Sequence, residues 1–196
     1  MSEKMELLPD PVRMVEGLRD TGYQFNTAVA DVVDNSIAAD ATFVDIRLNM
    51  NFRGDIVLEI FDNGIGMDRV TLINAMKSGS RPRPSPASLG KFGLGLKTAS
   101  TAYCRRLSVV SRANPEDPLI RATWDIDHIR DENRWELLID PASDQEKTDF
   151  TKVIGNHSGT LVLWHKVDRL LKSYTHLAGA SAQNALNRIR TSLKEH

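Results

Sequence analysis

The chain has 196 residues, of which 41% are hydrophobic and 26% charged, which is the composition of one globular domain with a sizeable core over residues 1–196. The 25 basic and 26 acidic residues leave a formal net charge of −1, so overall charge does not indicate nucleic-acid binding, although a local basic patch leaves DNA open as a partner. The single cysteine, Cys104, excludes an internal disulfide framework and is expected to be a packing residue in a reducing compartment. We expect a cytoplasmic protein without a membrane partner, because no apolar run approaches a membrane span and the first residues lack a secretory signal.

The first third of the sequence predicts two helices and a hairpin. Residues 11–20 begin with proline and are followed by Gly22, which is typical of a short helix. Over residues 25–39 apolar side chains recur at helical spacing, which indicates an amphipathic helix. Residues 44–50 alternate between apolar and polar side chains, as a half-buried strand does, and residues 56–61 form a more apolar run. The turn residues between these runs predict a β-hairpin.

The rest of the chain predicts further helices and strands around a long loop. Asp68 is the expected N-cap of a helix that reaches Met76. Residues 78–88 are rich in serine, proline and arginine, and loops of this length in compact domains often cover a binding site. Helices and a mostly antiparallel sheet, without regular β–α–β alternation, indicate an α+β sandwich. Beyond the loop we expect a helix at 93–103, strands at 107–111, 120–125, 135–139 and 160–165, a polar, turn-rich excursion at 141–157, and a helix at 174–194.

Asp31 and Asn35 form the first candidate motif, within DVVDNSIAADAT. They lie four residues apart on a predicted helix, so their side chains project from one face about one turn apart. An asparagine oxygen is a suitable hard ligand for Mg²⁺, and a carboxylate one turn away can orient a water for attack on a phosphoryl group. The same pair, taken alone, also fits a solvent-facing polar stripe on an amphipathic helix.

The second motif is the segment from Asp62 to Met67, DNGIGM, directly after an apolar strand. Gly64 and Gly66 allow a backbone to approach a flat ligand closely, and a buried Asp62 carboxylate can accept a hydrogen bond from an exocyclic amine such as adenine N6. A simple turn that uses Asp and Asn-Gly chemistry is the alternative.

The third motif is a glycine-rich segment that leads into a helix, with lysines that add positive charge and a threonine that adds a hydroxyl. Glycines before a helix N-terminus expose several N–H groups, and the helix dipole favours an anion there. Its spacing is neither that of a Walker P-loop nor that of a Rossmann fingerprint. The residues are Gly90, Lys91, Phe92, Gly93, Leu94, Gly95, Leu96, Lys97 and Thr98.

The fourth element is Gly159-Thr160 at the head of the predicted strand TLVLW. The Thr160 hydroxyl can share a water with Asp62 and complete an edge that reads a base. A β-branched residue at the start of a strand is also routine, so this element supports the other three and carries no function alone.

Together, in this order, the four elements resemble the GHKL superfamily, which includes gyrase, the large heat-shock chaperone, histidine kinases and MutL. DVVDNSIAADAT is similar to its N box, DNGIGM to its first glycine box, LGKFGLGLKTAS to its second, and Gly159-Thr160 to its closing Gly-Thr element. The N box that continues into Ala41-Thr42 and a strand is most similar to the MORC branch, with the MutL branch second. The resemblance covers roughly residues 12–165.

The resemblance implies a Bergerat-type two-layer α/β sandwich with an ATP lid at about residues 77–92. It implies that Asn35 binds Mg²⁺ between the phosphates, that Asp62 accepts from adenine N6, and that Thr160 joins Asp62 through water. It further implies that Gly66 allows close approach to the adenine and that Met67 packs on the ring. ATP or ADP contacts are then expected from Asn35, Asp62, Gly64, Gly66, Met67, Gly90, Lys91, Phe92, Gly93, Leu94, Gly95, Leu96, Lys97, Thr98 and Thr160.

Two positions depart from the family pattern. Asp31 stands where the family has a catalytic glutamate, so the base is shorter by one methylene and retracted by roughly 1.5 Å. Misplacement on that scale costs about a hundredfold in rate. Ala38 stands where the family often has another aspartate, and Asp34 is expected to form a structural ion pair rather than to do chemistry.

The resulting hypothesis is an Mg²⁺-dependent ATPase that hydrolyses slowly, with Asp31 as its catalytic base. In relatives of this type ATP closes the lid and drives dimerisation, so a nucleotide-dependent homodimer is expected. The alternative is a nucleotide-sensing switch without significant hydrolysis. A histidine kinase is disfavoured because no histidine has the setting of a phosphoacceptor, and a zinc site because the histidines lack ligand spacing. MutL- and MORC-type proteins carry a following domain that supplies a lysine to the terminal phosphate, and we expect this sequence to lack it.

Overall fold

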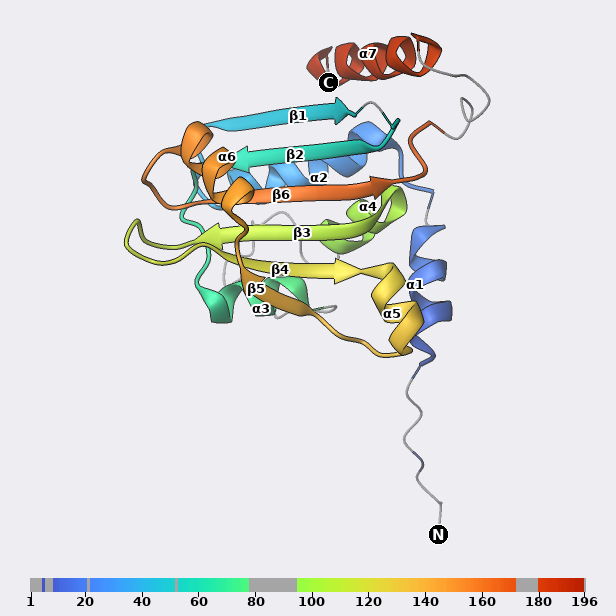
Figure 1. Cartoon of the computed structure of the whole chain (residues 1–196), viewed down its shortest axis with the longest axis horizontal. Coiled ribbons are helices and arrows are strands. Elements are labelled where there is room, and N and C mark those ends of the chain that lie inside the picture. Colours follow the sequence, from blue (N-terminus) through green and yellow to red (C-terminus); the bar gives the residue numbers. More distant parts are fainter. Residues whose placement is uncertain are drawn as a thin grey trace.

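A six-stranded antiparallel sheet forms the centre of the molecule (Figure 1). The computed structural model describes residues 5, 9–20, 22–51, 53–77, 95–171 and 180–195. The hairpin is confirmed, with Val44 opposite Asp62 and Met50 opposite Ile56. In spatial order the strands are β1 (Val44–Met50), β2 (Ile56–Asp62), β6 (Gly159–Val167), β3 (Cys104–Arg112), β4 (Ile120–Asp125) and β5 (Leu138–Pro141).

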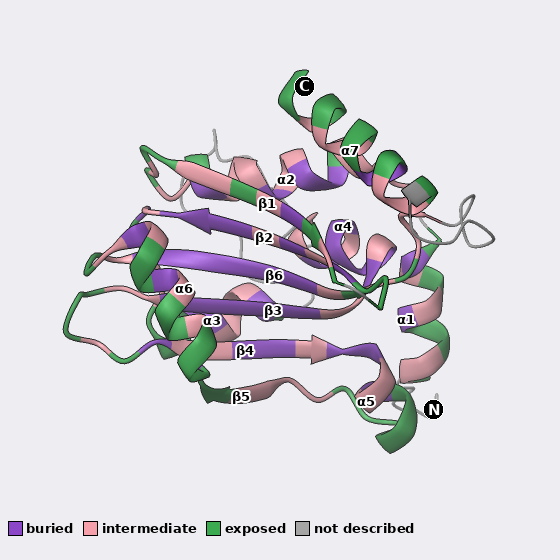
Figure 2. Cartoon of the chain, turned by 45° about the horizontal axis from the view of Figure 1, so that its top comes forward, coloured by how far each residue is buried: buried purple, intermediate pink, exposed green. Residues whose placement is uncertain are grey.

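The principal core lies between one face of the sheet and a layer of helices (Figures 1 and 2). Alternate strand residues such as Ile60 and Trp164 face this layer and are fully buried. The helices contribute small and branched side chains, including Val32, Leu72 and Ala99. The first helix begins with proline in its first turn, as the sequence predicts, and the Asp10 side chain caps it. The layer contains α2 (Phe25–Ile37), α3 (Arg69–Met76) and α4 (Gly95–Tyr103), and α1 (Pro11–Arg19) packs beside it.

The sequence expectation for residues 141–157 was wrong, because this stretch contains helix α6 (Asp144–Ile154). Ser143 and Glu146 form a reciprocal capping box at its start. Phe150 and Ile154 are buried against the opposite face of the sheet, together with Phe61 of β2. The polar residues that suggested a loop lie on the solvent side of a short amphipathic helix.

Two smaller differences concern α5 (Ile126–Glu132) and β5. Helix α5 was not predicted, and it buries Ile126 and Ile129 against α1. Strand β5 begins three residues later than expected. The described part of the last helix is α7 (Ala180–Glu195), whereas the predicted loop 78–88, most of the lid range and residues 172–179 lie outside the described residues. The prediction of an α+β fold with an antiparallel sheet is confirmed.

Helix α7 lies beside the β1 edge of the sheet (Figures 1 and 2). Its Arg190 donates from Nε to the carbonyl oxygen of Leu48 at 2.8 Å, and a second guanidinium nitrogen donates to the same oxygen. Asn26 at the start of α2 donates to Ser192 at 2.9 Å. Among the helices of the described ranges, none is both long and apolar enough to cross a membrane.

Candidate functional site

Asp62 is the buried carboxylate at the end of strand β2. Only 4% of its surface is exposed. The Ser36 hydroxyl donates to Oδ2 at 2.9 Å, and the Gly64 amide donates to Oδ1 at 3.0 Å. Burial raises the pKa of Asp62, and these hydrogen bonds to the carboxylate partly oppose that rise. The backbone of Thr160 is a third hydrogen-bond partner of this carboxylate. A carboxylate has about four acceptor sites, so the side chain can still accept a hydrogen bond from a ligand amine.

The turn after Asp62 requires glycine for contacts within the protein. Gly66 has φ +63°, and a Cβ there would lie 1.9 Å from the carbonyl oxygen of Arg112. A Cβ at Gly64 would lie 2.6 Å from the carbonyl oxygen of Ala39. The turn is therefore pressed against both β3 and the end of α2, which is a structural reason for both glycines beyond any approach to a ligand.

Thr160 lies directly opposite Asp62 across the β2–β6 pairing. Its hydroxyl lies 3.0 Å from that of Ser111, a residue of β3 that sequence reasoning missed. Ser111 is fully buried, donates to the carbonyl of Gly159 at 2.8 Å and accepts from the Met67 amide at 2.9 Å. Ser111 therefore ties the DNGIGM turn to the Gly-Thr element. Its signal in the sequence was only a serine inside an apolar strand, which does not reveal these partners.

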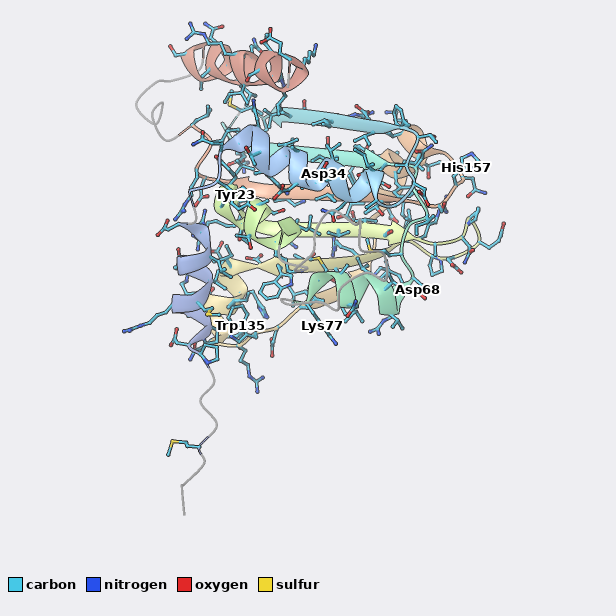
Figure 3. The ribbon with its side chains drawn as sticks, turned by 180° about the vertical axis from the view of Figure 1, so that it is seen from behind. Tyr23, Asp34, Asp68, Lys77, Trp135 and His157 are labelled. Carbon is cyan, nitrogen blue, oxygen red and sulfur yellow. The ribbon has the colours of Figure 1, made fainter. Side chains whose placement is uncertain are left out.

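Asp31 and Asn35 lie one turn apart on α2, and this helix packs beside α4 (Figure 3). A Cβ at Gly95 would lie 3.7 Å from Oδ2 of Asp31, so the carboxylate lies against the first residue of α4. The hydroxyl of Tyr23 donates to the same Oδ2 at 2.9 Å. The fold thus brings the first and third predicted motifs together, and it adds Tyr23, which sequence reasoning missed.

The orientation of Asn35 leaves its side-chain oxygen available to bind a metal ion. Its Nδ2 donates to the backbone carbonyl of Asp31 at 2.6 Å, so the side-chain oxygen points away from that bond. Within the part of the chain that the structure describes, no group of three or more His, Cys, Asp or Glu side chains could hold a metal ion. Mg²⁺ does not need such a group, because it keeps several waters and takes few protein ligands beside substrate phosphates. The residues present therefore fit a magnesium ion that is shared with a phosphate ligand.

The glycine-rich motif is described only from its helical end. Gly95, Leu96, Lys97 and Thr98 form the first turn of α4, which contains no acidic residue. Its first-turn N–H groups can therefore serve an anion. Leu96 packs against the principal core. Gly90, Lys91, Phe92, Gly93 and Leu94 lie outside the described residues.

Lys97, a lysine of the glycine-rich motif, is buried. Its ammonium donates to the carbonyl of Ala75 at 2.7 Å, at the end of α3. Trp124 donates to the next carbonyl, that of Met76, at 2.9 Å. Burial lowers the pKa of Lys97 to about 8. In this structure the amine therefore joins α4 to the C-terminus of α3, where the helix dipole favours a cation.

Arg112 anchors the loop that precedes the Gly-Thr element. Its guanidinium donates to the carbonyls of His157 at 2.9 Å and Gly155 at 3.2 Å, and to the side chain of Asn156 at 3.0 Å. It also lies 5.4 Å from the ring centroid of Phe150, within the range of a cation–π contact. A fork of planar donors suits this set of acceptors, so Arg112 fixes the loop that reaches Gly159.

Cys104 is fully buried and its pKa is raised by desolvation, as expected for a packing residue. No basic residue of the described ranges lies within ion-pair distance of Asp34, whose side chain is partly exposed on α2 (Figure 3), so the expected ion pair stays a prediction.

Comparison with known proteins assigns most of the chain to a sequence family. Residues 23–160 match the sequence family described as histidine kinase-, DNA gyrase B- and HSP90-like ATPases. The chain is 38% identical to the ATPase MORC2B of Mus musculus and 36% identical to the ATPase MORC2 of Homo sapiens, over 77 residues in each case, which is 37% of this chain and 8% of each relative. It is 32% identical to Protein MICRORCHIDIA 6 of Arabidopsis thaliana over 99 residues, which is 48% of this chain and 15% of that protein. The matched stretches are thus a small part of these relatives.

Proposed function

The chain belongs to the family of histidine kinase-, DNA gyrase B- and HSP90-like ATPases, and from this premise we propose that it binds ATP with Mg²⁺ and hydrolyses it slowly. The observation that carries the proposal is the position of Asp62. Its carboxylate is buried at a strand end and is held by Ser36, which lies on the same helix as Asp31 and Asn35. Helix α2 therefore connects Asp62, which could recognise a base, with the Asp31 carboxylate and the Asn35 amide oxygen. The last two groups are suited to phosphate chemistry.

In the proposed complex, Asp62 accepts a hydrogen bond from the exocyclic amine of adenine. A carboxylate discriminates against guanine, which presents a carbonyl oxygen at the corresponding position. Met67 packs on the ring beside Gly64 and Gly66, and Thr160 completes this edge through a water. Ser111 supports the proposal, because it connects the Met67 amide and the Thr160 hydroxyl in one buried cluster.

The phosphates are proposed to lie at the N-terminus of α4. The backbone N–H groups of the glycine-rich motif and the helix dipole attract them, and Asn35 holds the metal from α2. A bound Mg²⁺ would neutralise phosphate charge during transfer. The contacts proposed here are those of Gly90, Lys91, Phe92, Gly93, Leu94, Gly95, Leu96, Lys97 and Thr98.

Hydrolysis is proposed to use Asp31 as the general base. Its carboxylate lies against Gly95, where the terminal phosphate would approach the helix, so it can take a proton from the attacking water. An aspartate reaches less far than the glutamate of the family, and this supports a slow rate.

The second candidate function is a nucleotide-sensing switch without significant hydrolysis. The observation that favours it is Asp31 itself, whose side chain is one methylene shorter than the glutamate of the family. In that case nucleotide would act by ordering the lid, proposed at about residues 77–92, and by promoting a homodimer. We propose that nucleotide also orders the lid and promotes a homodimer if the protein hydrolyses ATP. We further propose that the protein is cytoplasmic and that its residues 1–196 form one nucleotide-binding domain.

Calorimetry with Mg·ADP and a non-hydrolysable ATP analogue tests the binding half. We expect dissociation constants in the micromolar range or weaker, and at least a tenfold loss for Asp62→Asn, because the amide presents a donor or a weaker acceptor to the adenine amine. The control is Asp68→Asn, directly after the same turn but exposed, where asparagine also caps a helix. Absence of binding to the parent protein with either nucleotide would overturn the proposal.

Phosphate release at saturating ATP, measured on the full-length protein, separates the two candidates. If Asp31 is the base, Asp31→Ala lowers turnover by about a hundredfold or more. If the parent and Asp31→Ala are equal and only Asp31→Glu gains turnover, the protein is a sensor.

A further inference from the structure

Tyr23 contacts the carboxylate that hydrolysis would use. Its hydroxyl donates to Oδ2 of Asp31 at 2.9 Å, although the residue lies outside every motif of the sequence. No ion pair links Asp31 to a lysine, arginine or histidine of the described ranges. The Tyr23 hydroxyl is thus the side-chain donor that the structure places on this carboxylate.

Tyr23 itself is held in place by the opposite end of helix α4. Tyr103, the last residue of that helix, donates its hydroxyl to the backbone carbonyl of Tyr23 at 2.6 Å. The Tyr103 ring stacks on Trp164 at 6.3 Å between centroids and meets Phe25 edge-on at 5.2 Å. These aromatic rings pack on the principal core. The backbone of Tyr23 is therefore fixed to the sheet, and only its side chain extends to Asp31.

Tyr23 is the donor in its hydrogen bond with Asp31, and this determines which lone pairs of Asp31 remain available to a water. Oδ2 is also the oxygen that faces the first residue of α4, Gly95. Burial and the neighbouring Asp31 raise the pKa of Tyr23 above its ordinary value, so the hydroxyl keeps its proton at neutral pH and acts as a donor. A donor on one lone pair of Oδ2 sets the rotation of the carboxylate and leaves Oδ1 and the second lone pair of Oδ2 to accept from a water.

We propose that Tyr23 is a positioning residue for Asp31, which compensates for the missing methylene by fixing the carboxylate toward the N-terminus of α4. This inference rests on the proposed hydrolysis of ATP. In that step the water oxygen bonds to the γ-phosphorus as the bond between that phosphorus and the bridging oxygen breaks, and ADP leaves with the electron pair. The water's proton passes to Asp31 and then to solvent, while Tyr23 keeps its own proton.

A double-mutant cycle of Tyr23→Phe and Asp31→Asn on the full-length protein tests the inference, with kcat from phosphate release and Kd from calorimetry. We expect Tyr23→Phe to lower kcat about ten- to hundredfold, in line with loss of a hydrogen bond to a charged group, with less than about a twofold change in Kd. In the Asp31→Asn background, Tyr23→Phe should have no further effect. A change of Kd with unchanged kcat, or the same loss in both backgrounds, would show a structural role and overturn the inference.

The matched control is Tyr103→Phe, which removes a hydroxyl from the same aromatic cluster without touching Asp31. Thermal unfolding of each variant confirms that it folds. We expect a smaller loss of kcat for Tyr103→Phe, and an equal loss would assign the effect to packing and overturn the inference. If the parent protein does not bind nucleotide, the proposed function itself is wrong. Binding without turnover overturns the inference about Tyr23 and leaves the binding function intact.

Discussion

Lys97 donates its ammonium to the carbonyl oxygen of Ala75 at 2.7 Å and thereby joins the first turn of α4 to the last turn of α3. The two helices flank the segment that contains the proposed phosphate loop, so this bond fixes the spacing between the ends of that segment. A lysine amine with only 7% of the residue exposed is unusual, and its burial should make the stability of the protein depend on pH.

The first prediction concerns that dependence. The folded state lowers the pKa of Lys97 from 10.5 to about 8. Between these values the unfolded chain binds more protons than the folded one, so the free energy of unfolding rises with pH across this window. The rise from this residue is at most about 3 kcal/mol. Lys97→Met should lose it, so the stability of the parent relative to Lys97→Met should increase between pH 8 and pH 10.5.

Urea unfolding of both proteins across that range measures the difference. Groups such as Cys104 titrate in both proteins and cancel. The control is Lys152→Met, which removes an exposed lysine from α6. Parallel stability curves for the parent and Lys97→Met would contradict the assignment.

The second prediction concerns the buried hydroxyl of Ser111. Ser111→Ala leaves the Met67 amide and the Gly159 carbonyl without their partner, so we expect a loss of about 1–3 kcal/mol in the free energy of unfolding. Nucleotide affinity should fall at least several-fold, because both partners belong to the proposed adenine side of the site. Chemical denaturation and calorimetry provide the two measurements.

Strand β3 offers a matched control for this change. Ser108 is also buried, and its hydroxyl lies 2.9 Å from that of Thr123, away from the site. Ser108→Ala should cost stability without a loss of affinity. If both variants lose affinity equally, Ser111 has no special relation to the site.

The third prediction compares two glycines that share a left-handed backbone. Gly66 has φ +63° and a Cβ there would lie 1.9 Å from the Arg112 carbonyl, whereas Gly54 has φ +86° with open space around it. Gly54→Ala should therefore cost only the backbone strain, about 1–2 kcal/mol, and leave nucleotide binding unchanged. Gly66→Ala should cost more, because either β3 or the turn must move, and it should abolish detectable binding. Equal unfolding curves for the two variants would show that the turn is not pressed against β3.

The parts of the fold that sequence predicted well are those with local signals. The hairpin of β1 and β2 follows from alternating side chains and a turn, and the start of α3 follows from the Asp68 cap. Helix α6 was missed because its apolar residues, Phe150 and Ile154, are sparse among charged ones, so the polar face concealed a helix. Its capping box from Ser143 to Glu146 was the local signal that could have identified it.

The residues of the candidate site also divide into those with a local sequence signal and those without one. Asp62 and Asn35 stand in short motifs whose chemistry is readable from the residues themselves. Ser111 and Tyr103 act through partners 44 to 80 positions away, and such pairings appear only once the sheet is assembled. Tyr23 lies eight residues before Asp31, but it precedes the helix, so helical spacing could not place it beside the carboxylate.

The contact between Arg190 and Leu48 has a consequence for how the molecule behaves among its own copies. Strand β1 ends the sheet, and an exposed strand edge offers backbone groups to which another chain can add as an extra strand. The Arg190 guanidinium donates a hydrogen bond to one of those carbonyls, that of Leu48, and α7 lies along that side of the sheet. At the other edge, β5 is short and ends in Pro141, which has no backbone N–H to offer. These features hinder strand addition at both edges of the sheet, and we expect a condition that detaches α7 to make β1 more prone to aggregation.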